Sequence, residues 1–161
     1  MQWRSWSFVD KSTWGPGPWQ DEPDKLQWTD ADTGLPCLIV RSSWHGALCG
    51  YVGVAEGHPA FARDHDEVDV TVHGGLTFSD FCDEGEEYGI CHIPAPGETE
   101  RVWWLGFDAG HARDLRPAWA ASGLKVSFVD CTYRDLAYMQ EQCAVLAAQL
   151  VEMSTQKAGV T

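Results

Sequence analysis

Short hydrophobic runs, broken by turn residues, dominate the first third of the chain after residue 25. The segments 26–31, 35–42 and 47–54 are largely apolar, and the sequences Asp-Thr-Gly and His-Gly mark the junctions between them. Such dipeptides and tripeptides between apolar runs are typical of hairpin turns. The run CLIVR is continuous rather than alternating, which favours a strand buried on both faces. These segments predict three consecutive strands.

A strict alternation follows further along. In the segment VDVTVHG, residues 68–74, valines at every second position alternate with Asp69, Thr71 and His73. This period of two predicts a half-buried strand whose outward row carries Asp69 and His73. The run RVWWLGF, residues 101–107, predicts another strand, and 125–130 is a candidate for a short one. Residues 55–67 and 75–100 read as loops.

Only the C-terminal part shows a convincing helical period. Its apolar residues fall on one helical stripe: Leu136, Met139, Cys143, Leu146, Ala147, Leu150 and Met153. Thr132 and Asp135 match a relaxed capping box at its start. The stripe is expected to cover one face of the sheet. We therefore predict an α+β fold, with an antiparallel or mixed sheet of about five strands and one long C-terminal helix packed on it.

The ends of the chain differ from its middle. Residues 1–25 read as an irregular, Trp-rich N-terminal arm, because the sequence WGPGPW cannot form a helix. An arm this aromatic is expected to pack on its own domain or on a second subunit, which favours a homo-oligomer. Residues 26–154 are expected to form a single α+β domain, and residues 155–161 a frayed tail.

The charge of the chain is uneven. The formal net charge of the 161 residues is −13, and residues 1–100 carry all of it, with 18 acidic and 5 basic side chains. This balance argues against general nucleic-acid binding, where phosphate contacts dominate affinity. It leaves room for a small anionic ligand in a local basic pocket. No apolar run is long enough to span a membrane and the first residues lack the apolar region of a signal peptide, so we expect no membrane association. The six cysteines show no C-x-x-C pair and are expected to be free thiols in a reducing cytosol.

Four stretches together carry a resemblance: CGYVGVAEGHP (49–59), EVDVTVHGGLTFSD (67–80), WWLGFDAGHARDL (103–115) and YRDLAYMQEQCAVLAAQL (133–150). Over roughly residues 26–152 the chain resembles a family of small uncharacterised proteins encoded by tailed bacteriophages. The resemblance implies a phage origin and the cytoplasm of an infected bacterium. It transfers no catalytic residues. It favours a modulator of a host process or of host defence.

The clearest candidate chemistry is a divalent-metal site. The sequence GFDAGHARDL places Asp108, His111 and Asp114 three residues apart, and His73 ends a neighbouring predicted strand. Imidazole and carboxylate groups are usual ligands of Zn, Mn or Fe, and a metal-bound water is the nucleophile of many hydrolases. The spacing matches no established metal motif. The competing interpretation is that both histidines make structural hydrogen bonds and that Asp108 caps the turn after it.

A second set of residues suits an anionic or aromatic ligand. His73, Gly74 and Gly75 follow a predicted strand and are expected to present backbone N–H groups to an anion. The arginines suited to phosphate are Arg113, Arg116 and Arg134, and the tryptophans suited to stacking include Trp44, Trp104 and Trp119. The primary hypothesis is a non-enzymatic binding protein of phage origin, which sequesters a small nucleotide signal or blocks a host defence protein. The alternatives are a metal-dependent hydrolase and a structural or assembly protein that oligomerises through its arm.

Overall fold

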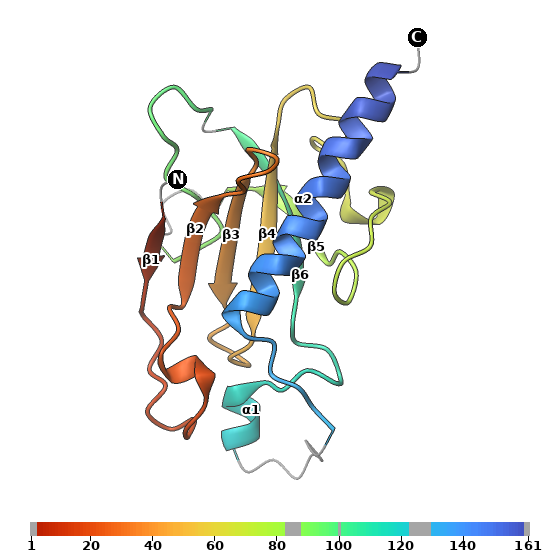
Figure 1. Cartoon of the computed structure of the whole chain (residues 1–161). Helices are drawn as coiled ribbons and strands as arrows, with labels where there is room; N and C mark the ends of the chain where they lie inside the picture. Colours follow the sequence, from red (N-terminus) through yellow and green to blue (C-terminus); the bar gives the residue numbers. More distant parts are fainter. Residues whose placement is uncertain (1–2, 83–87, 100, 123–129, 160–161) are drawn as a thin grey trace.

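The computed structural model describes residues 3–82, 88–99, 101–122 and 130–159. Its centre is one six-stranded, antiparallel sheet of order β1-β2-β3-β4-β6-β5 (Figure 1). The strands are β1 (Arg4–Trp6), β2 (Lys25–Thr29), β3 (Pro36–Arg41), β4 (Leu48–Ala55), β5 (Phe78–Phe81) and β6 (Val102–Asp108). The helix α2 (Leu136–Gly159) crosses one face of the sheet, and the short helix α1 (Pro117–Ala121) lies beyond one end of it. The predicted α+β class is confirmed.

Two apolar layers occupy the two faces of the sheet. On the α2 face, alternate residues of β3 and β4 pack against the helical stripe, where Met139, Cys143, Leu146, Ala147 and Leu150 are fully buried. On the opposite face, Leu38, Tyr51, Val102 and Trp104 form a second, smaller cluster. Burial of β3 on both faces explains the unbroken apolar run in its sequence.

The alternating segment 68–74 is not a strand, although its valines point inward as expected. Val68 and Val72 are buried, but the backbone runs beside α2 and not beside another strand. The Gln149 side chain donates to the carbonyl of Thr71 and accepts from its N–H, both at 2.8 Å. The Gln142 side chain accepts from the N–H of His73 at 3.0 Å. Glutamine amides of the helix thus take the place of strand partners.

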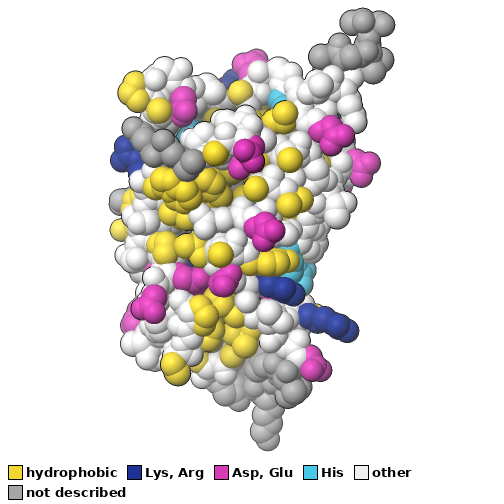
Figure 2. Space-filling view, viewed as in Figure 1, with side chains coloured by type: hydrophobic (Ala, Val, Ile, Leu, Met, Phe, Trp, Pro, Cys, Tyr) yellow, Lys and Arg dark blue, Asp and Glu magenta, His cyan; other side chains and the backbone are white. Residues whose placement is uncertain are grey.

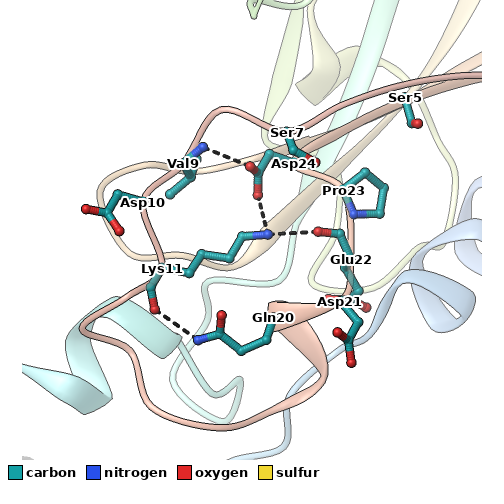
Figure 3. A pocket seen from close by; sticks show the side chains of 10 residues that line it. All are labelled: Ser5, Ser7, Val9, Asp10, Lys11, Gln20, Asp21, Glu22, Pro23 and Asp24. Carbon is teal, nitrogen blue, oxygen red and sulfur yellow. Dashed lines mark hydrogen bonds and ion pairs between the residues drawn. The ribbon is translucent and has the colours of Figure 1, made fainter.

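The N-terminal arm belongs to the domain. Residues 4–6 form the edge strand β1, and Pro18–Gln20 form a turn of 3₁₀ helix. Behind them lies a buried charge network (Figure 3), in which Lys11 Nζ contacts Asp24 Oδ1 at 2.9 Å and the carbonyl of Glu22 at 2.8 Å. The Nε of Arg41 donates to Asp24 Oδ1 at 2.8 Å, and its Nη1 to the Tyr133 hydroxyl at 3.0 Å. Apart from these two short elements the described part of the arm is irregular, and it packs on its own domain, which is one of the two expected outcomes.

The arm also holds the start of α2. Glu22 Oε2 accepts the backbone N–H of Leu136 at 2.7 Å, and Asp135 Oδ1 accepts that of Tyr138 at 2.9 Å. Asp135 is thus the N-cap itself. The predicted capping box from Thr132 is wrong, since Thr132 pairs with Asp114 in an isolated parallel bridge. The helix continues to Gly159, so residues 155–159, predicted as a tail, are helical.

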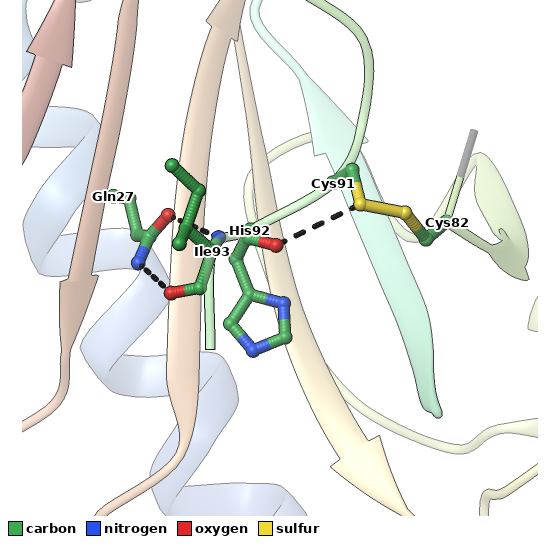
Figure 4. The surroundings of a disulfide bond; sticks show 5 residues. All are labelled: Gln27, Cys82, Cys91, His92 and Ile93. Carbon is green, nitrogen blue, oxygen red and sulfur yellow. Dashed lines mark hydrogen bonds between the residues drawn. A yellow bond between two sulfur atoms is a disulfide. The ribbon is translucent and has the colours of Figure 1, made fainter. Parts of the chain in front are cut away.

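Two further corrections concern the segment 75–100. The predicted loop 75–100 contains the strand β5, which pairs with β6. Cys82 and Cys91 form a disulfide with a Cα–Cα distance of 4.7 Å, so these two cysteines are not free thiols; Cys37, Cys49, Cys131 and Cys143 are (Figure 4). The candidate strand 125–130 lies almost entirely outside the described residues. No described helix combines the length and apolarity that a membrane span requires.

Candidate functional site

The loop that follows β6 brings most of the predicted site residues to one end of the sheet. Asp108 Oδ1 accepts the backbone N–H of Gly110 at 2.9 Å, and Asp108 Oδ2 accepts the Thr77 hydroxyl at 2.9 Å. Asp108 therefore caps its own turn, as the structural interpretation of the sequence expected. The loop 109–116 leads from this cap to α1 and carries Asp114, which contacts His73.

His73 and Asp114 are directly hydrogen-bonded. The Nε2 of His73 lies 2.9 and 3.0 Å from the two Asp114 carboxylate oxygens, and its Nδ1 lies 2.8 Å from the Tyr138 hydroxyl. Asp114 also accepts from Arg134 Nε and from the backbone N–H of His111, each at 3.1 Å. Burial acts to raise the pKa of Asp114, but the hydrogen bonds from His73, Arg134 and His111 outweigh it and hold that pKa below its usual value.

His111 lies against the same turn. Its ring centroid is 6.1 Å from that of His73, and its Nε2 is 3.5 Å from Asp108 Oδ1. Gly74 has a φ of +69°, and a Cβ atom on it would overlap the His111 ring. The glycine at this position is therefore required both by the backbone conformation and by the packed imidazole.

The four predicted metal ligands form two pairs. His73 pairs with Asp114, and His111 approaches Asp108, but both nitrogens of His73 already have protein partners. Among the described residues, the one group of three or more whose ligand atoms all lie within 4.8 Å of one another is Asp64, His65 and Asp66. That group is solvent-exposed or half-exposed and adjacent in sequence, a common arrangement on acidic surfaces. The geometry around His73 matches a structural hydrogen-bond network more closely than a metal centre.

Next to this network lies an aromatic–arginine cluster, which we define as Trp44, His45, Arg116 and Trp119. Trp44 and Trp119 meet edge to face, with ring centroids 4.8 Å apart and an interplanar angle of 84°. The Arg116 guanidinium carbon lies 4.5 Å from the Trp119 ring centroid. Trp44 comes from the turn between β3 and β4, and Trp119 from α1. Trp44 is 73% exposed, the highest value among the large hydrophobic residues that the structure describes.

His45 adds a hydrogen-bond donor to the cluster. Its Nδ1 accepts the backbone N–H of Ala47 at 3.0 Å, and burial lowers its pKa despite the nearby Asp108 carboxylate. The imidazole is therefore neutral at pH 7 with its proton on Nε2. This nitrogen lies beside Gly110, where an added Cβ atom would stand 2.8 Å from it. His45 thus presents an N–H group toward the loop 109–116.

Arg116 retains hydrogen-bonding capacity. Its Nη1 donates weakly to the Gly110 carbonyl at 3.4 Å, and its buried Nε has no acceptor among the described residues. Figure 2 shows one face of the molecule, where acidic and hydrophobic side chains are scattered and Lys/Arg side chains lie beside a histidine on one flank. A local positive charge within an acidic chain is the kind of feature that selects an anion.

The other predicted ligand residues divide into accessible and inaccessible ones. Trp104 is fully buried in the second core and stacks edge to face with His92, so it offers no face to a ligand. Arg113 is exposed in the loop beside the cluster. Gly75 has a φ of +79° and open space around it. Arg134 is committed to Asp114 and Tyr138.

Two contributors were missed from sequence. The sequence marks His45 only as part of a hairpin turn, and Tyr138 lies outside the apolar stripe of the C-terminal helix. The position of His45 in a hairpin turn is an available signal, whereas nothing in the sequence places Tyr138 beside His73.

No family model, curated protein or solved structure matches the chain. The resemblance to phage-encoded proteins and the residence in an infected cell therefore stay predictions.

Proposed function

We propose that this protein is a non-enzymatic binding protein, and that the aromatic–arginine cluster binds a small anionic ligand with a flat ring, of which a nucleotide is the simplest example. The observation that carries the proposal is that Trp44 and Arg116 both contact the Trp119 ring. These residues are distant in sequence, and each is suited to one half of such a ligand.

The cluster offers three kinds of contact. The exposed Trp44 ring is a stacking surface, and stacking of a base on an aromatic side chain contributes about 1–3 kcal/mol. The Arg116 guanidinium supplies charge and N–H donors for a phosphate. The neutral His45 supplies a single N–H donor. Stacking, charge and one directional hydrogen bond together favour a ring that carries an anionic group over a simple anion or a simple ring.

Binding without chemical turnover is favoured because the neighbouring hydrogen-bond network of His73 and Asp114 is already satisfied by protein groups. His73 is held at both nitrogens, and Asp114 accepts from three groups. A general base needs a free position facing the reacting atom. For a protein of phage origin, such binding would sequester a nucleotide signal of host defence.

The test is thermal stabilisation and calorimetry with a panel of mononucleotides and cyclic dinucleotides, followed by chromatography of the recovered nucleotide. A ligand at one hundred times its Kd stabilises the fold by about 2.7 kcal/mol. We expect at least one nucleotide to bind and to be recovered intact. Trp44→Ala is expected to weaken its affinity by roughly 5- to 150-fold, the equivalent of a lost stacking contact. Arg116→Gln is expected to weaken the binding of a phosphorylated ligand more than the binding of the corresponding nucleoside.

Two control variants separate this surface from general effects. Trp3→Ala removes another exposed tryptophan, 51% exposed, at the β1 edge, and Arg63→Gln removes an exposed arginine. Both are expected to bind like the wild-type protein. If Trp44→Ala and Arg116→Gln also bind like wild type, or if no nucleotide binds, the proposal is wrong. If the protein hydrolyses the nucleotide, the binding proposal is replaced by the hydrolase hypothesis.

A further inference from the structure

A second hollow lies on the sheet face opposite α2, at the other end of β3 from the aromatic–arginine cluster. Two adjoining cavities of about 270 and 190 Å³ share Pro36, His92 and Glu98 as walls. The sheet provides a mainly apolar floor that includes Gly53 and Val102. Each cavity by itself is below the ~300–1,000 Å³ of pockets for drug-sized molecules, so each suits a compact group.

His92 is the buried polar side chain that lines both cavities. The residue is only 8% exposed, and its ring stacks edge to face on Trp104 with centroids 5.2 Å apart. Figure 4 shows the ring projecting away from the Cys82–Cys91 disulfide. Burial lowers the pKa of His92, although Glu98 acts to raise it and Lys25 to lower it further. The neutral imidazole keeps one nitrogen as an acceptor.

Glu98 sets the charge at the mouth of the hollow. Its Oε2 accepts the backbone N–H of Ala95 at 3.0 Å, which fixes the carboxylate at the pocket wall. The opposing Lys25 ammonium lies 4.9 Å from the Trp6 ring centroid, on the β1 side. The sequence up to residue 100 carries the whole net charge of −13, so the surrounding field also favours a cation.

The wall that carries these two side chains is anchored. The Gln27 side chain accepts the N–H of Ile93 and donates to its carbonyl, both at 2.8 Å. The disulfide fixes Cys91, one residue before His92, to the end of β5 (Figure 4). A wall held on both sides of His92 makes the hollow preformed, which lowers the entropy that a ligand loses on binding.

We infer that this hollow is a binding site for a small organic ammonium ion with a compact apolar body. The ammonium group donates to the His92 imidazole and pairs with the Glu98 carboxylate, and the apolar body lies on the floor around Gly53 and Val102. The site is separate from the aromatic–arginine cluster, because the two lie at opposite ends of β3. A test of the ammonium site is therefore independent of whether the cluster binds a nucleotide.

The test is titration of the ¹⁵N-labelled full chain with benzylammonium chloride and, as the uncharged equivalent, benzyl alcohol. We expect NMR shift changes in residues 27–29 and 92–99, and a preference for the ammonium of about two- to fivefold, the range for a solvent-accessible ion pair. Glu98→Gln is expected to abolish this preference. The control Glu152→Gln removes an exposed carboxylate of α2 and should retain it.

His92→Phe preserves a ring of similar size and is expected to weaken binding of the ammonium ion more than binding of the alcohol. If that variant fails to fold, the ¹⁵N shifts of the wild-type His92 ring are measured instead, and benzylammonium should move them. The inference is overturned if neither probe shifts residues near the hollow, if the ammonium preference survives Glu98→Gln, or if the His92 ring shifts are unaffected by the ammonium ion.

Discussion

Two polar regions flank the start of α2, and they differ in how their charges are satisfied. In the buried charge network of the arm, Lys11, Glu22, Asp24 and Arg41 neutralise one another, and the Arg41 guanidinium has an acceptor at every nitrogen. In the region after β6, the buried Nε of Arg116 has no acceptor among the described residues, and His111 Nε2 makes no hydrogen bond there although it lies 3.5 Å from Asp108 Oδ1.

This difference separates a structural role from a binding role. Buried charges are retained at low cost only when each is paired and hydrogen-bonded, as in the arm network. Donors left without acceptors are costly to the isolated fold, and they are found where another molecule completes them. The unsatisfied Arg116 nitrogen therefore supports the proposal that the aromatic–arginine cluster, and not the arm, binds a ligand.

The largest expected effect comes from breaking the arm network. Arg41→Met removes one of the two cations that pair with the buried Asp24 carboxylate and breaks the ion pair with Glu22, and it should lower the free energy of unfolding by about 3–5 kcal/mol. Urea denaturation followed by tryptophan fluorescence measures this. The matched control Arg63→Met removes an exposed arginine 4.0 Å from Glu67 and should change stability by less than about 0.5 kcal/mol. Equal losses in the two variants would contradict the assignment.

Alanine at two neighbouring glycines tests the packing of the His111 ring. Gly74 and Gly75 both have positive φ, so either substitution should cost about 1–2 kcal/mol in backbone strain. Gly74→Ala should cost a further 1–3 kcal/mol or so, because its Cβ overlaps His111, whereas the space at Gly75 is open. Denaturation curves of both variants give the difference. Indistinguishable losses would mean that His111 is not packed on Gly74.

Asp114→Asn tests the His73 network. Loss of the charged hydrogen bonds from His73 and Arg134 should lower stability at pH 7 by about 1.5–3 kcal/mol. The pKa of Asp114 is lower in the folded than in the unfolded chain, so its contribution is fully present above about pH 4 and is lost as the pH falls through the folded value. Urea denaturation between pH 3 and 7 should therefore show a shallower acid loss in the variant. An unchanged slope would show that Asp114 is not held in its charged form.

The smallest effect on stability is expected at Trp44. Its side chain is mostly exposed, so Trp44→Ala should change the free energy of unfolding by less than about 0.5 kcal/mol. The buried Trp28 provides the contrast, since Trp28→Ala should cost about 3–5 kcal/mol. A large loss at Trp44 by thermal denaturation would make this tryptophan a structural residue and remove the basis for its role in recognition.

The fold class could be predicted because its signals are local. The hairpins of residues 26–54 and the apolar stripe of α2 are determined by residues close together in the sequence. The failures have long-range causes. The alternation of Val68, Val70 and Val72 correctly reported burial of one face, but the partner of their backbone is the side chains of α2 rather than a strand. The edge strand β1 depends on pairing with β2, and the Cys82–Cys91 bond has no spacing signature.

The candidate site divides in the same way. Trp44 and Arg116 were proposed as ligand residues from their chemistry alone, and only the fold shows that they meet at Trp119. The predicted metal set was assembled from spacing, but side-chain directions separate it into two pairs. Trp104 was offered as a stacking surface, and the alternation of β6 instead buries it completely. Residue types along a chain indicate which chemistry is available, whereas the direction of each side chain in the fold decides which groups share a site.

The contact between Glu22 and the first turn of α2 has a kinetic consequence. The two residues that it joins, Glu22 and Leu136, are 114 positions apart. The ribosome synthesises the arm long before α2. Until the helix forms, the Glu22 carboxylate is hydrated and lacks its hydrogen bond from the backbone N–H of Leu136. Long-range closure of this kind slows folding relative to local contacts. We expect the docking of α2 to be the late step that commits the chain to its native state.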